Sequence, residues 1–405
     1  MNLIQVNKID FELFFIGTTV TQNLCEGSIA GSVAGNKFQL NLVIGLDEAG
    51  DQKINVFSLL PYPMYPKGKK IWFNTKRCSL NKQITTILIP FINLPIIKQL
   101  SVSISFFITL ISGLWNNRSK QCIVLVYNVF SPFSIPVLLA TRLFNCKSVA
   151  IIADLPFDDY DFKGLKGILQ RIDFYVQTHI ISKFSGVIGL TSKIISEFAP
   201  LLPSIVIEGG IDIIDEGTTF SIPKKDKEII CLYSGALNEI NGIKLLLDAF
   251  NLISEVDFRL WILGDGPLSC LVEQAAELDN RIVYWGKVSN QQAKICQREA
   301  TVLINPRPSD NKIAKYTFPS KLLEYLLSGR PVISTRLPGI PEDYNPHLIF
   351  LETETSHDLA VLIQEVCLGD TYDIDTIGTN GRKFVVSKKN WTCQSKSIHD
   401  FLITL

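Results

Sequence analysis

The residues best suited to chemistry stand close together in one segment, which reads Phe-Pro-Ser-Lys-Leu-Leu-Glu-Tyr-Leu-Leu-Ser-Gly-Arg-Pro-Val-Ile-Ser over positions 318–334. Pro319 suits the first position of a helix and Gly329 suits the helix exit, so the segment predicts a helix followed by a buried strand. Leucines at helical spacing would form its buried face. The opposite face would carry the polar side chains, namely Ser320, Lys321, Glu324 and Ser328.

A serine, a cation and a carboxylate beside the free N–H groups of a helix start are suited to an anionic ligand. Helical side chains lean toward the N-terminus, so we expect Glu324 to point back at the position where a phosphate or sugar would lie. The alternative is structural, with Glu324 only stabilising the dipole of an amphipathic helix. The residues around this helix favour the first interpretation.

Phe318 and Pro319, followed by Glu324 and then Ser-Gly-Arg-Pro-Val-Ile, resemble the donor-site motif of glycosyltransferases with the GT-B fold, most closely glycosyltransferase family 4 (group 1). The family pattern is Glu-x-Phe-Gly-x4-Glu, so the resemblance implies that Glu324 holds the ribose of a nucleotide sugar. The family's first Glu, which contacts the donor sugar, falls on Tyr316, and its Gly falls on Pro319. Residues 337–344 resemble a subgroup of bacterial capsule, lipopolysaccharide and exopolysaccharide transferases.

A second segment, residues 233–243, matches the family's Gly-Arg-Leu-x3-Lys-Gly loop in position and length, which aligns its glycine with Gly235. Ala236 replaces the family's arginine and Asn241 replaces its lysine. In the family those cations neutralise the donor diphosphate, and a diphosphate leaving group needs such stabilisation.

Two other cations could take over this role. Lys321 shares the helix face of Glu324, and Arg307 follows a predicted strand one loop earlier. We hypothesise that both contact the diphosphate and that Lys321 also acts in catalysis. The alternative is that both are ordinary surface charges.

The remaining candidates lie in other strand-to-helix turns. The resemblance implies that Gly264 and Gly266 line the nucleotide pocket, and that Gly17 and Gly27 form a loop for phosphate or acceptor. Asp154, at a strand end, is a candidate catalytic contact to the donor or acceptor sugar. The complete donor site expected in this way comprises Tyr316, Phe318, Pro319, Ser320, Lys321, Glu324, Arg307, Gly235, Gly264 and Gly266.

Composition limits the class of protein. With 405 residues of which 47% are hydrophobic, the chain can bury large cores in two domains. The nine cysteines are scattered singly without metal-ligand spacing, which favours a reducing compartment. We expect no metal and no cofactor other than the nucleotide sugar, which is a substrate, and no nucleic-acid partner.

Charge is unevenly distributed along the chain. Residues 1–200 carry 19 Lys and Arg against 12 Asp and Glu, a net +7, and residues 201–405 carry 20 against 27, a net −7. No acidic residue stands between Asp51 and Asp154, and twelve cations do. The same region holds two uncharged apolar runs, residues 84–97 and 100–115, each shorter than the roughly 18–20 residues of a spanning helix.

We expect both runs to form core or interfacial helices. Cations beside apolar helices predict peripheral binding to an anionic membrane face. The alternative is that residues 100–115 form a buried helix with solvated lysines around it. The N-terminus lacks the pattern of a signal peptide, so we expect a cytoplasmic protein at the inner face of the cell membrane.

The pattern of apolar runs predicts an α/β chain with two Rossmann-like domains, which in the GT-B fold face each other across a cleft. Strands are expected at 11–16, 39–44, 122–127, 148–152 and 186–189 in the first half, and at 229–233, 258–263, 281–285, 301–305, 331–334 and 348–351 in the second. Helices are expected at 242–252, 267–278, 289–300, 319–328 and 357–367. The expected parts are an acceptor-binding domain (1–209), a linker (210–227), a nucleotide-sugar-binding domain (228–385) and a C-terminal helix that crosses back to the first domain (386–405).

The resemblance implies a metal-independent glycosyltransferase that moves a sugar, with retention of configuration, from a nucleotide sugar to a lipid-linked saccharide in bacterial surface-polysaccharide synthesis. Ala236, Asn241 and Tyr316 keep a second interpretation open, a nucleotide-sugar-binding pseudoenzyme or scaffold of an assembly complex. A nucleotide-sugar 2-epimerase shares the fold but would need carboxylates or histidines that converge on the sugar. The sequence does not reveal the sugar, the base or the acceptor.

Overall fold

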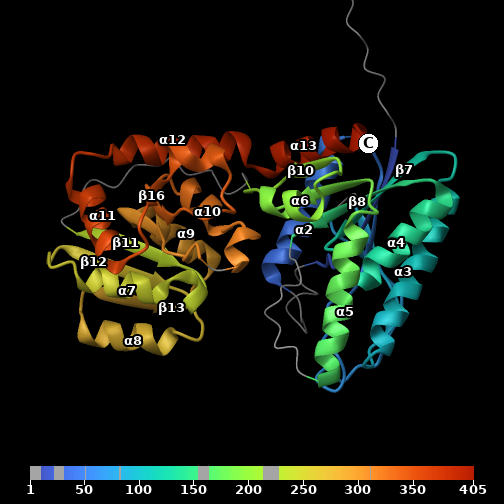
Figure 1. Ribbon diagram of the computed structural model, residues 1–405, viewed down its shortest axis with the longest axis horizontal. Coiled ribbons are helices and arrows are strands. Elements are labelled where there is room, and N and C mark those ends of the chain that lie inside the picture. Colours follow the sequence, from blue (N-terminus) through green and yellow to red (C-terminus); the bar gives the residue numbers. More distant parts are fainter. Residues whose placement is uncertain are drawn as a thin grey trace, which may run out of the picture. The chain divides into compact units, whose positions relative to one another are not determined.

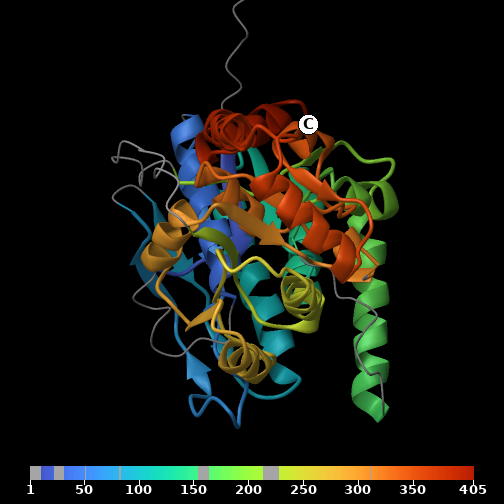
Figure 2. The ribbon, with the colours of Figure 1, turned by 90° about the vertical axis from the view of Figure 1, so that its left-hand side faces the viewer.

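Two compact units make up the chain in a computed structural model that describes residues 11–21, 32–50, 52–81, 84–153, 164–212, 228–310 and 312–405 (Figure 1). The first unit comprises Met1–Ile207 together with Trp391–Leu405, and the second comprises Glu208–Asn390. Each is built on a largely parallel β-sheet with helices packed against it (Figure 2), so the predicted α/β class is confirmed. Most of the expected linker lies outside the described residues.

The second unit contains a six-stranded sheet in which every neighbouring pair is parallel, in the order β13-β12-β11-β14-β15-β16. Its strands are β11 (Ile229–Ser234), β12 (Phe258–Leu263), β13 (Ile282–Gly286), β14 (Val302–Asn305), β15 (Val332–Thr335) and β16 (Ile349–Leu351). Its α-helices are α7 (Ile243–Asn251), α8 (Ser269–Leu278), α9 (Asn290–Glu299), α10 (Lys321–Leu327), α11 (Ser356–Leu368) and α12 (Ile374–Lys388). All strands and helices expected in this half are present, with small shifts at their ends.

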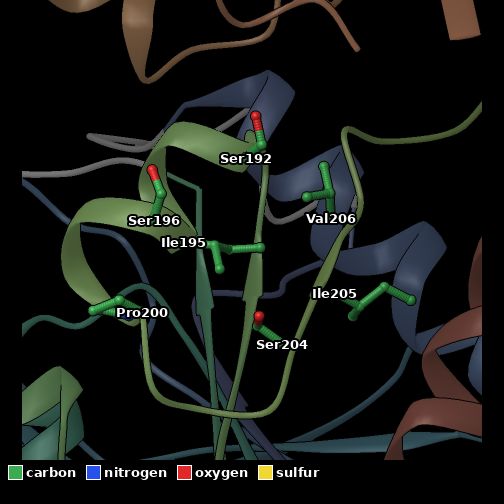
Figure 3. Close-up of a pocket in the computed structure, with 7 residues that line it drawn as sticks. All are labelled: Ser192, Ile195, Ser196, Pro200, Ser204, Ile205 and Val206. Carbon is green, nitrogen blue, oxygen red and sulfur yellow. The ribbon is translucent and has the colours of Figure 1, made fainter. Parts of the chain in front are cut away.

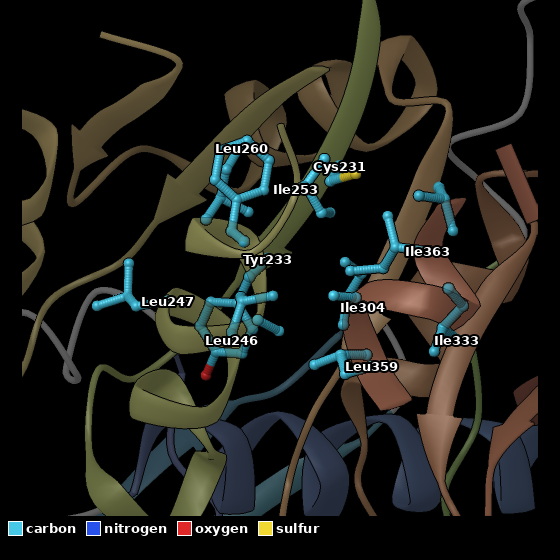
Figure 4. Close-up of a cluster of buried hydrophobic side chains, with 14 of the residues drawn as sticks. Cys231, Tyr233, Leu246, Leu247, Ile253, Leu260, Ile304, Ile333, Leu359 and Ile363 are labelled. Carbon is cyan, nitrogen blue, oxygen red and sulfur yellow. The ribbon is translucent and has the colours of Figure 1, made fainter. Parts of the chain in front are cut away.

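Strand β11 shows why this sheet is buried on both faces. Cys231 and Tyr233 point into a core formed with α7, α8 and α11 (Figure 4), and Leu232 between them points into a second core formed with α9, α10 and α12. The alternation follows from the two-residue period of a strand. Both faces need helices, which explains the continuous apolar runs in the sequence.

The first unit contains an eight-stranded sheet in the order β10-β9-β8-β7-β1-β2-β5-β4, with only β4 antiparallel to its neighbour. Its strands are β1 (Phe11–Gly17), β2 (Ile54–Ser58), β4 (Lys76–Ser79), β5 (Thr85–Leu88), β7 (Gln121–Tyr127), β8 (Lys147–Ile152), β9 (Gly186–Gly189) and β10 (Ser204–Val206). A separate antiparallel ribbon pairs β3 (Trp72–Phe73) with β6 (Phe91–Ile92). The helices are α2 (Val33–Ala49), α3 (Ile97–Asn116), α4 (Ser131–Phe144), α5 (Gly164–Ile181), α6 (Ser192–Phe198) and α13 (Trp391–Ile403).

The prediction of a strand at residues 39–44 is wrong, because these residues lie inside α2. The side chain of Ser32 caps this helix by accepting a hydrogen bond from Gly35 N at 3.1 Å. Leu42, Val43 and Leu46 are buried at helical spacing, against α13 and the sheet. The strand that pairs with β1 is instead β2, whose half-buried Asn55 interrupts the apolar run.

The expected helix at residues 84–97 is also wrong. This segment contains β5 and β6, separated by Pro90, and α3 begins at its last residue. A proline disfavours helical conformation in the residue before it, and Pro90 and Pro95 divide the run into pieces too short for a helix. The second apolar run does form a helix, α3.

A buried ionic cluster joins the beginning and the end of the second unit. Lys389 forms ion pairs with Glu208 and, at 2.9 Å, with Asp343, and Tyr344 Oη donates a hydrogen bond to Glu208 Oε1 at 2.9 Å. Glu208 is 4% exposed and Lys389 is 9% exposed. Backbone pairing continues the contact, because Ile211 N donates to Lys389 O at 2.9 Å. The two chain ends of this unit are therefore held together.

We predict that Glu208→Ala lowers the free energy of unfolding by about 3–5 kcal/mol, because it leaves the buried ammonium of Lys389 without its main partner. Urea unfolding of the intact chain measures this loss. Glu228→Ala is the matched control, since Glu228 is half-exposed and pairs with Arg259 at 2.9 Å. The control should cost less than about 1 kcal/mol. Equal losses in the two variants would contradict a structural role for the cluster.

Candidate functional site

The carboxyl ends of the parallel strands in the second unit bring its glycine turns together. Gly235 N, after β11, donates to Leu263 O at 2.8 Å, and Gly264 N, after β12, donates to Gly286 O at 2.8 Å. A Cβ on Gly264 would lie 1.8 Å from Gly235 O, and φ is +139° there. Backbone therefore packs directly on backbone, which only glycine permits. Open parallel sheets bind ligands at this edge.

Lys321, the first residue of α10, reaches the turn after β11. Its Nζ donates to Tyr233 Oη at 2.6 Å and lies 4.3 Å from the centre of the Tyr233 ring. Tyr233 Oη in turn donates to Ala236 O at 2.8 Å. A Cβ on Gly235 would lie 2.1 Å from Lys321 Nζ, so the glycine leaves room for the ammonium group. Lys321 thus lies beside the glycine turn after β11, and its contact with a donor diphosphate stays a prediction.

The pKa of Lys321 is lowered to about 7, first by burial and then by the positive charge of Arg307, while Glu324 opposes the shift. Burial also lowers the pKa of Arg307. Among the described residues neither cation forms an ion pair with a carboxylate. An anion bound beside them would relieve both the desolvation and the repulsion.

Arg307 is fixed by the loops around it. Its Nη2 donates to Thr317 Oγ1 at 2.9 Å, and its buried Nε has no hydrogen-bond partner within the described part of the chain. Gly242, with φ +76°, allows close approach, since a Cβ there would lie 1.9 Å from Pro306 O. The guanidinium group thus keeps an unused donor beside the glycine loop.

Glu324 lies one turn after Lys321 on α10 and its side chain is exposed, as a ligand contact requires. Ser320 is also exposed, but it does not cap the helix with its side chain. The expectation that Ser328 shares this open face is wrong. Ser328 is buried, and its hydroxyl donates to Tyr325 O at 2.6 Å.

The residues before α10 are more enclosed. Phe318 and Pro319 are buried, and the ring of Phe318 packs 5.4 Å from that of Tyr344. Tyr316 is partly buried. We therefore assign Phe318 and Pro319 to positioning of the helix start.

Sequence analysis missed two tyrosines that position the site. Tyr325 Oη accepts a hydrogen bond from Ser234 N at 2.8 Å and donates to Ser234 O at 3.2 Å, which ties α10 to the end of β11. Burial raises the pKa of Tyr325 to about 12, so it stays protonated. The hydroxyl of Tyr233 accepts the hydrogen bond from Lys321 Nζ. Both tyrosines stand on an otherwise apolar strand or helix face. This pattern could have indicated their roles, since the hydroxyl of a buried tyrosine needs a hydrogen-bond partner.

The positions without the family's cations have structural partners. Asn241 Nδ2 donates to Ala236 O at 2.8 Å, and Asn241 N donates to Asn238 Oδ1 at 2.9 Å. The amide therefore braces the loop instead of supplying charge. In the next turn, Gly266 N donates to Asp265 Oδ1 at 2.8 Å, and a Cβ on Gly266 would lie 2.4 Å from Leu237 O.

Of the candidate site residues in the first unit, the structure describes only Gly17. Gly17 ends β1, where a Cβ would lie 2.2 Å from Gln39 Oε1, and Thr18 N donates to that oxygen at 2.8 Å. Close packing thus accounts for this glycine. Gly27 and Asp154 lie outside the described residues.

Two other features of the described residues were considered as sites, a metal-binding cluster and a surface hollow. Within the described ranges no three His, Cys, Asp or Glu side chains could hold a metal ion together. A surface hollow in the first unit (Figure 3) has no titratable side chain in its lining. It is lined by Ser192, Ile195, Ser196, Pro200, Ser204, Ile205 and Val206.

Comparisons with known proteins identify a sequence family and a fold. Residues 228–367 match the sequence profile of the family described as "Glycosyl transferases group 1". N-acetyl-alpha-D-glucosaminyl L-malate synthase of Bacillus anthracis is 27% identical over 121 residues. That match spans 29% of this chain and 30% of the curated relative's length.

Solved structures match nearly the whole chain. Anabaena HepE in complex with UDP has a TM-score of 0.65 and 14% identity, covering 97% of this chain and 100% of that one. The lipopolysaccharide outer core galactosyltransferase WaaB has a TM-score of 0.66 and 16% identity, covering 97% and 99%. The GT-B fold with two Rossmann-like domains is therefore confirmed.

We predict that one lysine titrates near pH 7 and that Lys321→Met removes this titration. NMR of protein carrying ¹³C-labelled lysine follows each Cε signal as the pH is raised. Arg307→Met should raise the pKa of Lys321, because it removes the neighbouring positive charge. Lys383→Met, at an exposed position on α12, is the control and should leave the titration unchanged. A wild-type protein whose lysines all titrate at ordinary alkaline pH would contradict the burial of Lys321.

Proposed function

We propose that this chain, a GT-B protein that carries a group 1 glycosyltransferase domain, transfers a sugar from a nucleotide-sugar donor to a saccharide acceptor. The single observation that carries the proposal is the placement of Lys321 and Arg307. Both are partly buried cations without a carboxylate partner among the described residues, beside the glycine turns at the carboxyl edge of a parallel sheet. A donor diphosphate supplies the negative charge that this arrangement needs.

Each residue has a separate role in donor binding. Lys321 and Arg307 contact the diphosphate, and the carboxylate of Glu324, one helical turn on, accepts hydrogen bonds from the ribose hydroxyls. Gly235, Gly264 and Gly266 let the nucleotide approach the backbone. The complex of HepE with UDP supports a donor of this chemical class.

The same contacts stabilise the transition state. As the bond between the anomeric carbon and the diphosphate oxygen breaks, negative charge grows on the leaving diphosphate. Lys321, protonated when the diphosphate is bound, and Arg307 stabilise that charge in a site already ordered by Tyr233 and Tyr325. The acceptor hydroxyl oxygen then bonds to the anomeric carbon on the face that the diphosphate leaves, which retains the configuration, and the hydroxyl proton passes to the departing diphosphate. Asp154 is the proposed polar contact to the donor or acceptor.

The acceptor we propose is a lipid-linked saccharide of a bacterial surface polysaccharide, at the inner face of the cell membrane. WaaB, named as a lipopolysaccharide galactosyltransferase, supports this class of acceptor. The uninterrupted excess of cations in residues 52–153 is a second, independent support, because anionic lipids attract such a segment.

A second candidate function is nucleotide-sugar binding without transfer. Ala236 and Asn241, in place of the family's two cations, favour it. A turnover assay with nucleotide sugars and extracted lipid acceptors separates the two. Release of nucleoside diphosphate that depends on the acceptor supports the transferase, and tight binding without release supports the scaffold.

We predict that Glu324→Gln weakens nucleotide-sugar binding by about tenfold to a hundredfold, the loss expected when hydrogen bonds to a charged group are removed. Isothermal titration calorimetry measures this affinity, after a thermal-shift screen has selected the best of the UDP, GDP, dTDP and ADP sugars. Glu299→Gln, at an exposed position of α9, is the matched control. Unchanged affinity in Glu324→Gln would rule out the ribose contact.

We also predict that nucleotide-sugar affinity falls as the pH rises above about 7. The bound diphosphate favours protonated Lys321, whose pKa in the free protein is about 7, so binding above this pH requires proton uptake. The decrease should approach about tenfold per pH unit. Below pH 7 the amine is already charged and the affinity should level off.

Calorimetry across the pH range tests this dependence. Lys321→Met should bind weakly and independently of pH, while Lys383→Met should keep the wild-type profile. A pH-independent wild-type affinity would show that Lys321 does not face the diphosphate.

A further inference from the structure

The β3–β6 ribbon of the first unit and the loop before it form a basic aromatic platform. Its exposed apolar side chains are Met64 (44%), Tyr65 (42%), Ile71 (43%) and Trp72 (57%). Its exposed cations are Lys67, Lys69 and Lys70. Large apolar side chains and lysines on one loop and its ribbon match the polar and apolar layers of a membrane interface.

Packed aromatic rings and backbone hydrogen bonds hold the platform in place. The ring of Phe73 stacks on Phe91 with centroids 4.4 Å apart, and Tyr62 packs 4.9 Å from Phe73. Asn93 Nδ2 donates to Pro63 O at 2.9 Å and to Lys70 O at 3.0 Å. The exposed side chains therefore stand on an ordered base.

Helix α3 continues this surface. Lys98 Nζ, in its first turn, donates to Tyr62 O at 2.8 Å. One face of α3 packs on the core through Val102, Phe106, Leu110 and Leu114. The other face bears an exposed stripe at helical spacing, formed by Ile97 (45%), Leu100 (63%), Ile104 (51%), Ile108 (62%) and Trp115 (58%).

Helix α4, which packs beside α3, extends the apolar area (Figure 1). Its exposed apolar side chains are Ile135, Leu139 and Leu143. Among the described residues α3 is also the one helix long and apolar enough to cross a membrane, with 20 residues and a mean hydropathy of 1.5. Its buried face holds it against the sheet, so it can meet a bilayer only lengthwise.

We propose that the platform and the exposed stripe of α3 form one surface that docks on an anionic lipid bilayer. Trp72 and the stripe enter the boundary between head groups and acyl chains, and the platform lysines contact the anionic head groups. The inference rests on the proposed function in one respect, that a lipid-linked acceptor lies in the same bilayer.

Charge selects a bilayer over a second copy of the chain. No acidic residue stands at positions 52–153, while the exposed Arg118 and Arg142 lie near the ends of α3 and α4. Two copies meeting through this surface would place lysines against lysines. Anionic lipid supplies the complementary charge.

Flotation with phosphatidylcholine vesicles, with and without phosphatidylglycerol, tests the surface. The full chain should float with the anionic vesicles at low salt, and the double variant Ile104→Glu/Ile108→Glu should lose this binding by at least about tenfold, because two apolar side chains no longer enter the lipid. Leu201→Glu is the matched control, since Leu201 is a 95% exposed apolar residue of the same unit outside the surface.

A triple variant, Lys67→Gln/Lys69→Gln/Lys70→Gln, tests the charge contribution. Each lysine near an anionic surface is worth about a fivefold change in partition, so the three together should lower binding to anionic vesicles by about a hundredfold. Gel filtration of the same proteins without lipid reports their oligomeric state.

Three results would overturn the proposal. In the first, the wild-type chain does not float with anionic vesicles. In the second, the Ile104→Glu/Ile108→Glu variant floats as well as Leu201→Glu. In the third, the chain is a dimer without lipid, and only the double variant is monomeric. Thermal stabilisation by nucleotide sugars, measured on every variant, separates this test from the proposed function. A chain that no longer floats but is still stabilised by nucleotide sugars would count against the membrane surface alone. A wild-type chain that floats but is not stabilised by nucleotide sugars would count against the donor site alone.

Discussion

The contact between the ammonium group of Lys321 and the phenol of Tyr233 is the interaction on which the candidate site depends. It places a cation in a partly buried turn beside a second cation, Arg307, although both groups lose hydration there. Such an arrangement costs stability unless an anion completes it. The fold supports it with hydrogen bonds from Tyr325 to the backbone of Ser234, which hold α10 against the end of β11. The proposed donor site is thus ordered by contacts within the chain, which is what electrostatic stabilisation of a leaving diphosphate requires.

The replaced family positions fit the same account. A larger residue at Gly235 would occupy the place of the Lys321 ammonium, and Asn241 braces the loop through Ala236 O. The cations of this site stand at the start of α10 and in the loop after β14. Two different segments therefore carry the two positive charges that one glycine loop carries in the family pattern. If the chain binds a donor diphosphate as we propose, this arrangement supplies the charge that the two missing loop cations would have given.

The second unit was predictable from sequence because its strands and helices alternate strictly and each apolar run has the length of one element. The first unit was less predictable. The apolar residues at positions 39–44 fit a strand as well as a helix, and only the cap at Ser32 and the burial of Leu46 one turn later distinguish them. Among site residues, Lys321, Arg307 and Glu324 could be proposed from the helix spacing taken together with the resemblance to the family motif. The roles of Tyr233 and Tyr325 could not, because they depend on which strand end α10 meets in three dimensions, and sequence spacing carries no such information.

The central claim, that Lys321 faces the outer phosphate of the bound nucleotide, is tested most directly by comparing a nucleoside diphosphate with its monophosphate. Calorimetry at pH 6.5, below the pKa of about 7 of Lys321, measures the ratio of the two affinities in the wild-type chain and in Lys321→Met. The account predicts that the wild type prefers the diphosphate by at least about tenfold, as a charge-assisted contact implies, and that the variant loses most of this preference. An equal preference in both proteins would contradict it.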